Sequence, residues 1–200
     1  MDKLAISVII LNYNGKHWIR RCLESLVRQT ILTDIEIIVA DNSSSDGSDS
    51  LAQALLKPLD GRGRLLQNGA NLGYCEGNNR GAAAASGKYL LFLNNDTWLE
   101  PNCLEQILHM TEAAGADAAS PRVLNYEDDS FQTHGAEGFD LFGYLTSQQI
   151  PLPTGEIFAP PGCALFIKRA VFEKLGGFDP QFFMYADETD LSWRLGLAGY

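Results

Sequence analysis

The chain has 200 residues, of which 46% are hydrophobic and 20% are charged, so it holds enough apolar material for the core of one large domain. Its formal net charge of −10 argues against nonspecific binding of DNA or RNA, which depends on clustered Lys and Arg side chains. Its four cysteines are widely spaced and form no CxxC pair, which argues against a structural zinc site and favours free thiols in a reducing compartment.

Strand and helix patterns alternate along the first 125 residues. Apolar runs predict strands at residues 4–11, 35–40, 64–67, 89–93 and 117–123. Apolar side chains at helical spacing predict helices at residues 17–28, 46–56, 76–86 and 101–114. This alternation is typical of an α/β fold, in which a mostly parallel, Rossmann-like sheet carries helices on both faces.

The composition changes after residue 125. Residues 126–161 are rich in Gly, aromatic and polar residues, which predicts loops and short antiparallel strands. A strand at residues 162–168 and helices at residues 169–175 and 187–198 are predicted to follow. We therefore divide the chain into a subdomain of residues 1–125 and a small, irregular and antiparallel subdomain of residues 126–200. Because the sequence stops directly after a predicted helix, we interpret it as truncated there.

The sequence gives no sign of a membrane-spanning segment. The N-terminal residues do not form a signal peptide, and the apolar runs are far shorter than the roughly 20 residues that a membrane helix needs. We expect a cytoplasmic protein without a transmembrane segment in this chain; peripheral attachment at the inner membrane face is the alternative.

Acidic residues follow several of the predicted strands. Asp41 closes the second apolar run, Asp96 follows the run at residues 89–93, and Asp187, Glu188 and Asp190 open the last predicted helix. In open α/β sheets, ligands bind at the carboxyl ends of the strands. Acids gathered at that edge suggest a site that holds a metal ion and moves protons.

Three common motifs are absent. Residues 81–88 resemble a phosphate-binding loop, but their spacing is one residue too long and they precede a strand instead of following one. No GxGxxG follows the first strand, which argues against a dinucleotide oxidoreductase, and no GxSxG marks a hydrolase nucleophile.

Five segments in a fixed order together resemble the family 2 glycosyltransferases of the GT-A fold. The resemblance is greatest to the branch that contains rhamnosyltransferases and other cell-surface polysaccharide enzymes, and it spans nearly the whole chain. The segments are Ser7–Asn14, Ile38–Ser48, Asn71–Gly81, Leu91–Thr97 and Asp187–Arg194.

The resemblance implies a set of nucleotide-binding residues. Asn12, Tyr13 and Asp41 would hold the base, usually uracil or thymine, and Asn79 and Arg80 would contact the nucleotide or its phosphates. Two other interpretations stay open from the residues alone. Asp41 is also suited to a local turn, because Ser and Asn side chains follow it. Asn79 and Arg80 could equally lie on a solvated face of a helix.

The resemblance also implies a divalent cation, Mg²⁺ or Mn²⁺, at Asp96. This residue matches the last acid of the family's DxD-type motif, but here the motif reads Asn94–Asn95–Asp96 and keeps a single carboxylate. Asn94 or Asn95 could still bind the ribose or the sugar. The alternative role of Asp96 is to cap the helix that starts near Pro101.

Glu188 matches the family's catalytic base, with Asp187 before it and Asp190 after it. The structural alternative is that Asp187 is the helix N-cap and Asp190 pairs with Arg194 one turn later. We expect both to hold, with Asp187 and Asp190 partly structural and Glu188 facing the acceptor.

The function implied by the resemblance is inverting transfer of a sugar from a UDP- or dTDP-type nucleotide sugar to a hydroxyl of a saccharide or lipid-linked saccharide acceptor. Two alternatives are a sugar-nucleotide nucleotidyltransferase, which the lack of a Gly-rich loop after the first strand disfavours, and a nucleotide-binding module without turnover.

Overall fold

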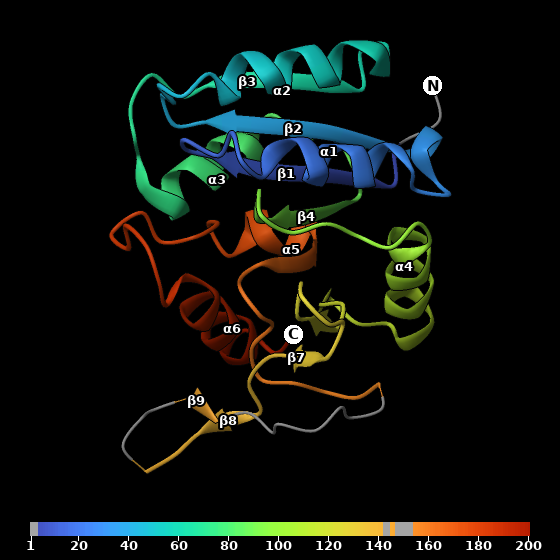
Figure 1. Ribbon diagram of the computed structural model, residues 1–200. Coiled ribbons are helices and arrows are strands. Elements are labelled where there is room, and N and C mark those ends of the chain that lie inside the picture. The colour runs from blue at the N-terminus through green and yellow to red at the C-terminus, as the bar shows by residue number, and fades with distance from the viewer. Residues whose placement is uncertain (1–3, 142–144, 147–153) are drawn as a thin grey trace.

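The computed structural model describes residues 4–141, 145–146 and 154–200 (Figure 1). Six strands form its main sheet in the order β3-β2-β1-β4-β10-β5. The bounds are β1 Ile6–Asn12, β2 Ile35–Asp41, β3 Gly63–Gln67, β4 Tyr89–Leu93, β5 Ala118–Ala119 and β10 Ala164–Lys168. Strands β3, β2, β1 and β4 are parallel neighbours, whereas β10 runs antiparallel to both β4 and β5. The predicted mostly parallel α/β sheet is therefore confirmed.

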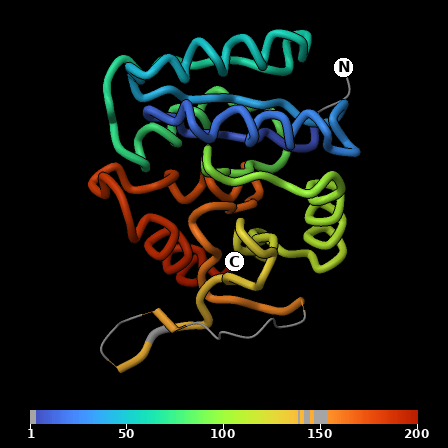
Figure 2. The backbone as a smooth tube through the Cα atoms, in the orientation of Figure 1, coloured from blue at the N-terminus to red at the C-terminus, as the bar shows by residue number. Residues whose placement is uncertain are grey.

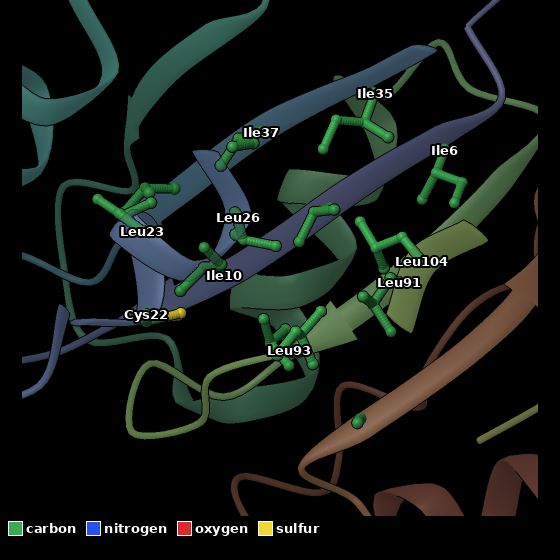
Figure 3. Packing of buried hydrophobic residues seen from close by; sticks show 14 of the residues in the cluster. Ile6, Ile10, Cys22, Leu23, Leu26, Ile35, Ile37, Leu91, Leu93 and Leu104 are labelled. Carbon is green, nitrogen blue, oxygen red and sulfur yellow. The ribbon is translucent and has the colours of Figure 1, made fainter. Parts of the chain in front are cut away.

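Helices cover both faces of this sheet. The helices are α1 Ile19–Val27, α2 Ser48–Leu56, α3 Gly73–Ala83, α4 Cys103–Ala114, α5 Arg169–Lys174 and α6 Asp187–Leu197. Side chains alternate between the two faces along β1, as expected for a strand that is buried on both sides. Val8 and Ile10 pack into one apolar cluster with α1, α2 and α4, part of which is shown in Figure 3. Ile9 packs into a second cluster with α3, α5 and α6.

The parallel strands end level with one another. Asn12 at the end of β1 lies opposite Asp41 at the end of β2, and Asp41 lies opposite Gln67 at the end of β3. This register places the polar residues that follow the strands along a single edge of the sheet, which is the edge where α/β folds bind ligands.

One predicted strand is wrong as a single element. Residues 117–123 form two short strands, β5 and β6 (Val123–Leu124), which belong to different sheets. Pro121 lies between them, lacks a backbone N–H and restricts the preceding Ser120, so the run cannot continue as one ladder.

Helix α3 begins at Gly73, three residues before the predicted start. Gly73 has φ of +78°, and its N–H donates to Asn71 Oδ1 (3.2 Å). A Cβ atom at position 73 would lie 2.5 Å from the carbonyl oxygen of Phe183, so only glycine fits this close approach. The helix start is thus set by a contact 110 residues away in sequence, which a local pattern does not reveal.

The second half of the chain contains short antiparallel pairs, as predicted. Strand β6 pairs with β7 (Phe131–Thr133), and β8 (Gly138–Phe139) pairs with β9 (Leu145–Thr146). Part of the predicted loop region, residues 142–144 and 147–153, lies outside the described residues. Figure 2 shows how the chain then returns to the main sheet through β10 before the last two helices. No helix within the described ranges is long and apolar enough to cross a membrane.

Candidate functional site

Asn12 joins three loops at the ligand-binding edge of the sheet. Its side chain has no exposed surface. Its Nδ2 lies 2.7 Å from Asp41 Oδ1, 2.8 Å from Ser48 Oγ and 3.1 Å from Ser44 Oγ, and its Oδ1 accepts a hydrogen bond from Asn95 Nδ2 (3.0 Å). The predicted base-binding residue is therefore occupied on both its polar atoms by other protein groups.

Asp41 is also fully buried. Besides Asn12, its carboxylate accepts hydrogen bonds from the Ser44 N–H (2.9 Å) and the Ser44 hydroxyl (2.7 Å). This is the turn role that the following Ser and Asn residues suggested. Ser43 in the same turn has φ of +62°, an uncommon conformation for a residue with a side chain.

The loops after β1 and β2 are tied to each other by several further bonds. The Asn14 N–H donates to Ser44 Oγ (2.9 Å), the Ser45 N–H donates to Asn14 Oδ1 (2.8 Å), and the Lys16 N–H donates to Asp46 Oδ2 (2.9 Å). Tyr13, between these anchored residues, keeps half of its surface exposed. The two loops thus form a preorganised support with one aromatic ring presented to solvent.

The segment after β4 carries the predicted metal ligand. The Asn94 N–H donates to the carbonyl of Cys163 (3.0 Å), and Asn94 O accepts from the Thr97 N–H (3.1 Å), which closes a tight turn. Asp96 is exposed at this turn, whereas Asn95 points back to Asn12. Backbone bonds therefore hold the turn while the Asp96 carboxylate stays accessible.

This donor set fits Mg²⁺ or Mn²⁺ only if the ligand supplies most of the coordination. Within the part of the chain that the structure describes, no three His, Cys, Asp or Glu residues form a metal cluster. Burial, followed by the charge of Asp96, raises the pKa of the nearby Cys163 thiol to about 11. A hard cation that binds one carboxylate together with phosphate oxygens and water matches Asp96, with Asn94 as a further oxygen donor.

Glu188 lies against the chain segment that reaches this turn. A Cβ atom on Gly162 would lie 3.3 Å from Glu188 Oε2, so the carboxylate packs on the glycine backbone. The Tyr74 hydroxyl donates to the carbonyl of the same glycine (3.0 Å). The charges of both Asp96 and Glu188 contribute to the raised pKa of Cys163, the residue after Gly162, so both acids lie near this residue.

The three acids thus lie along one edge of the sheet, although they are remote in sequence. The connecting contacts are Asp41 to Asn12, Asn12 to Asn95, Asn94 to Cys163, and Gly162 to Glu188.

Asp187 is buried directly beside Glu188. Burial and then the Glu188 charge raise its pKa to about 6, although backbone N–H groups at 185, 187 and 188 offset part of this effect. The N-cap of α6 is Ala186, with φ of +61°, and not Asp187, which is the first helical residue. The alternative N-cap role of Asp187 is therefore wrong, and the carboxylate instead lies near the predicted base.

Asp187→Asn is expected to stabilise the protein at neutral pH. A carboxyl whose pKa is raised on folding favours the folded state below its unfolded pKa, and this contribution is lost as pH rises through the folded pKa. A rise from 3.8 to about 6 corresponds to at most about 3 kcal/mol of unfolding free energy, lost between about pH 4 and pH 6. Urea unfolding at pH 4 and pH 7.5 should show a smaller pH difference for the variant than for the wild type.

Asp190→Asn serves as the contrast, because it removes a charge partner from the same helical turn and is expected to lower stability at neutral pH. A wild-type pH difference that persists in Asp187→Asn would show that other groups cause it.

Asp190 has a structural partner. Its Oδ2 accepts hydrogen bonds from Arg194 Nε (2.9 Å) and Nη2 (2.7 Å). Arg194 also donates to the carbonyls of Leu175 and Gly177, at 2.9 Å each, and so holds the segment after α5. The i,i+4 pair expected from the sequence is present, and it anchors α6.

Asn79 and Arg80 are engaged within the protein. Asn79 donates to the Phe178 carbonyl (2.8 Å) and accepts from the Phe178 N–H (3.0 Å), so its amide pins a segment 99 residues away. Arg80 is exposed on α3, and it bonds Glu76 (3.0 Å) and the carbonyl of Asn68 (3.1 Å). Arg80 lies beside the end of β3, three strand positions from the turn that carries Asp96, and the Asn79 amide is held by the Phe178 backbone through both its nitrogen and its oxygen.

Two residues at this edge escaped the sequence analysis. Gly15 is buried and its Cα lies against the hydrogen bond between Asn12 and Asn95. In the sequence, only its place after a polar turn could have indicated this role. Asn68, directly after β3, donates to Asn42 Oδ1 (2.8 Å), but its buried Oδ1 has no partner among the residues that the structure describes. No sequence pattern distinguishes such an acceptor.

Two surface cavities lie away from the acidic edge of the sheet. One of about 600 Å³ is lined by α2 and β3, and one of about 400 Å³ lies between α1 and α2. Neither includes any residue of the acidic edge, so they add nothing to this site.

Comparisons with known proteins agree on one family. The model of the family described as "Glycosyl transferase family 2" matches residues 7–176. The chain is 31% identical over 181 residues to the uncharacterised glycosyltransferase alr2836 of a Nostoc species, covering 88% of this chain and 55% of that protein. It is 31% identical over 120 residues to the succinoglycan biosynthesis protein ExoO of Rhizobium meliloti, covering 60% of this chain and 33% of that protein.

Among solved structures, the mannosyltransferase PcManGT of Pyrobaculum calidifontis, in complex with GDP-Man and Mn²⁺, superposes with a TM-score of 0.75 at 19% identity. The match covers 99% of this chain and 53% of that one, and it shows a shared fold. The chain thus spans about half or less of the length of each of these proteins.

Proposed function

The chain belongs to glycosyl transferase family 2, and on that basis we propose that it transfers a sugar from a nucleoside diphosphate sugar to an acceptor hydroxyl in cell-surface polysaccharide synthesis. The donor is proposed to be of the UDP or dTDP type and the acceptor a saccharide or lipid-linked saccharide. Similarity to a succinoglycan biosynthesis protein supports the polysaccharide role. The motif set supports placement in the branch that contains rhamnosyltransferases, acting in the cytoplasm or at the inner membrane face.

The observation that carries this proposal is the alignment of Asp41, Asp96 and Glu188 along one edge of the sheet. A nucleotide sugar needs a base site, a diphosphate site and a reacting carbon in series, and these residues are arranged in that order. We propose that the base lies on the exposed ring of Tyr13 beside Asp41. Because Asp41 is buried, contact between its carboxylate and the base requires the Ser43–Ser44 turn to move.

At the diphosphate, Asp96 is proposed to hold Mg²⁺ or Mn²⁺, with Asn94 as a polar neighbour. Arg80 lies beside the end of β3 and is proposed to act at the nucleotide end of the site. The cation, when bound, neutralises charge that develops on the departing diphosphate. In our proposal, the amides of Asn12, Asn95 and Asn79 shape the site from within, because each is hydrogen-bonded to another part of the protein.

At the reacting carbon, Glu188 is proposed to accept the proton of the acceptor hydroxyl. The acceptor oxygen forms a bond to the anomeric carbon as the bond between that carbon and the diphosphate oxygen breaks, which inverts the anomeric configuration. The buried Asp187 places a second carboxyl behind Glu188, and the Asp190–Arg194 pair fixes the helix that carries all three acids.

A panel of nucleoside diphosphates tests the proposal. With Mn²⁺ present, UDP or dTDP should raise the melting temperature and bind in calorimetry, whereas GDP and ADP should bind at least about tenfold more weakly. The matching nucleotide sugar should be slowly hydrolysed or transferred. Tight binding without any turnover would favour the module alternative, and absence of binding to every nucleotide would refute the proposal.

A further inference from the structure

The hydrogen bond between Asn95 Nδ2 and Asn12 Oδ1 links the turn that carries Asp96 to the loops proposed to support the base. It continues the register of β1 and β4 beyond the end of β4, because Ile6 lies opposite Tyr89 and the same offset of 83 residues separates the two asparagines. If β4 continued for two more residues, its pairing with β1 would place Asn95 opposite Asn12, and the hydrogen bond holds Asn95 at this position.

Asn12 has no atom left for a ligand. Its Nδ2 lies within hydrogen-bonding distance of three oxygen acceptors, on Asp41, Ser44 and Ser48, and its Oδ1 receives Asn95. The nitrogen has only two hydrogens for these three acceptors, so a nucleotide base that accepted from it would have to displace an existing bond. Because the Asn12 side chain is paired on both polar atoms and has no exposed surface, its role is to hold the neighbouring loops in place.

Gly15 shows how closely this hydrogen bond is enclosed. A Cβ atom at position 15 would lie 2.2 Å from Asn95 Nδ2 and 2.4 Å from Asn12 Oδ1, the two atoms that form the bond. Gly15 does not need a positive φ, so the requirement for glycine here comes from this contact. Any side chain at position 15 would force the two amides apart.

We propose that Asn12 and Asn95 are positioning residues, whose hydrogen bond fixes the Asp96 turn at a set distance from the base-binding loops. The inference rests on the proposed function and deepens it: the spacing between the Asp96 turn and the loop that carries Tyr13 is built into the protein before any ligand arrives. Loss of the bond should therefore weaken the part of nucleotide binding that depends on the cation, and leave the part that depends on the base.

Asn95→Ala tests this through UDP and dTDP affinity, measured by calorimetry with Mn²⁺ and again with EDTA. In the wild type, Mn²⁺ should tighten binding of the preferred nucleotide. In Asn95→Ala this gain should shrink about tenfold, as expected for a residue that orients a metal ligand, while affinity in EDTA changes less than about twofold. Gly15→Ala should give the same pattern by wedging the bond apart; if it does not fold, Asn95→Ala decides alone.

Asn102→Ala is the matched control, because it removes an exposed asparagine amide further along the same connection that makes no cap hydrogen bond to α4. It should keep both affinities. Equal losses with and without Mn²⁺ in Asn95→Ala would mean that Asn95 contacts the nucleotide itself, and an unchanged gain would mean that the bond does not position Asp96; either overturns the inference alone. A wild type that binds no nucleotide would refute the proposed function as well.

Discussion

Glu188→Gln is expected to bind the donor nucleotide sugar normally and to lose sugar transfer by about 10²–10⁴-fold, the usual contribution of a general base. Glutamine keeps the shape that packs against Gly162, but it has no carboxylate to accept the acceptor proton. Initial rates with the preferred nucleotide sugar, beside calorimetric affinity for that donor, measure the two effects separately.

The control is Glu173→Gln, which changes an exposed glutamate that pairs with Arg169 on α5 and should leave transfer unchanged. Normal turnover in Glu188→Gln would assign the base to one of its acidic neighbours. Asp187 is then the next candidate, because its raised pKa of about 6 lies closer to neutral pH than that of an ordinary aspartate.

Asp96→Ala is expected to abolish the gain in nucleotide affinity that Mn²⁺ provides. It removes the one carboxylate of the turn after β4, and the described residues offer no cluster of acids that could take over. A loss of about 100-fold in the presence of Mn²⁺, equivalent to about 2.8 kcal/mol of binding free energy, is expected, with little change in EDTA.

Glu100→Ala is suited as the comparison, because it removes an exposed acid from the same connection four residues later. If Asp96→Ala bound the nucleotide with Mn²⁺ as tightly as the wild type, Asp96 would not belong to the site, and the cation would need a different residue.

The sequence predicted the sheet well because burial dominates it. Strands that are apolar on both faces leave a continuous run of Val, Ile and Leu, as in the run that becomes β2, and this pattern depends on the strand itself and not on its partners. The run at residues 117–123 misled the prediction because its apolar content hid the break that Pro121 imposes.

The partners of the polar side chains were much harder to predict. Asn79 follows a motif that resembles a nucleotide site, yet its amide bonds the backbone of Phe178. Asn12 is likewise engaged by residues 29 to 83 positions away. An amide side chain can donate to or accept from many kinds of group. The sequence shows where an asparagine stands, but it does not show which group the fold brings next to it.

The place of β10 in the sheet has a consequence for synthesis on the ribosome. The apolar edge of β4 pairs with β10, which the ribosome adds only after the whole irregular region of residues 126–161. Until then the edge of Tyr-Leu-Leu-Phe-Leu is an open template for other chains, the kind of exposure that nascent proteins shield with chaperones. Residues 1–125 alone therefore leave one edge of β4 unpaired, and the nascent chain is protected from aggregation at this edge only when β10 has been added.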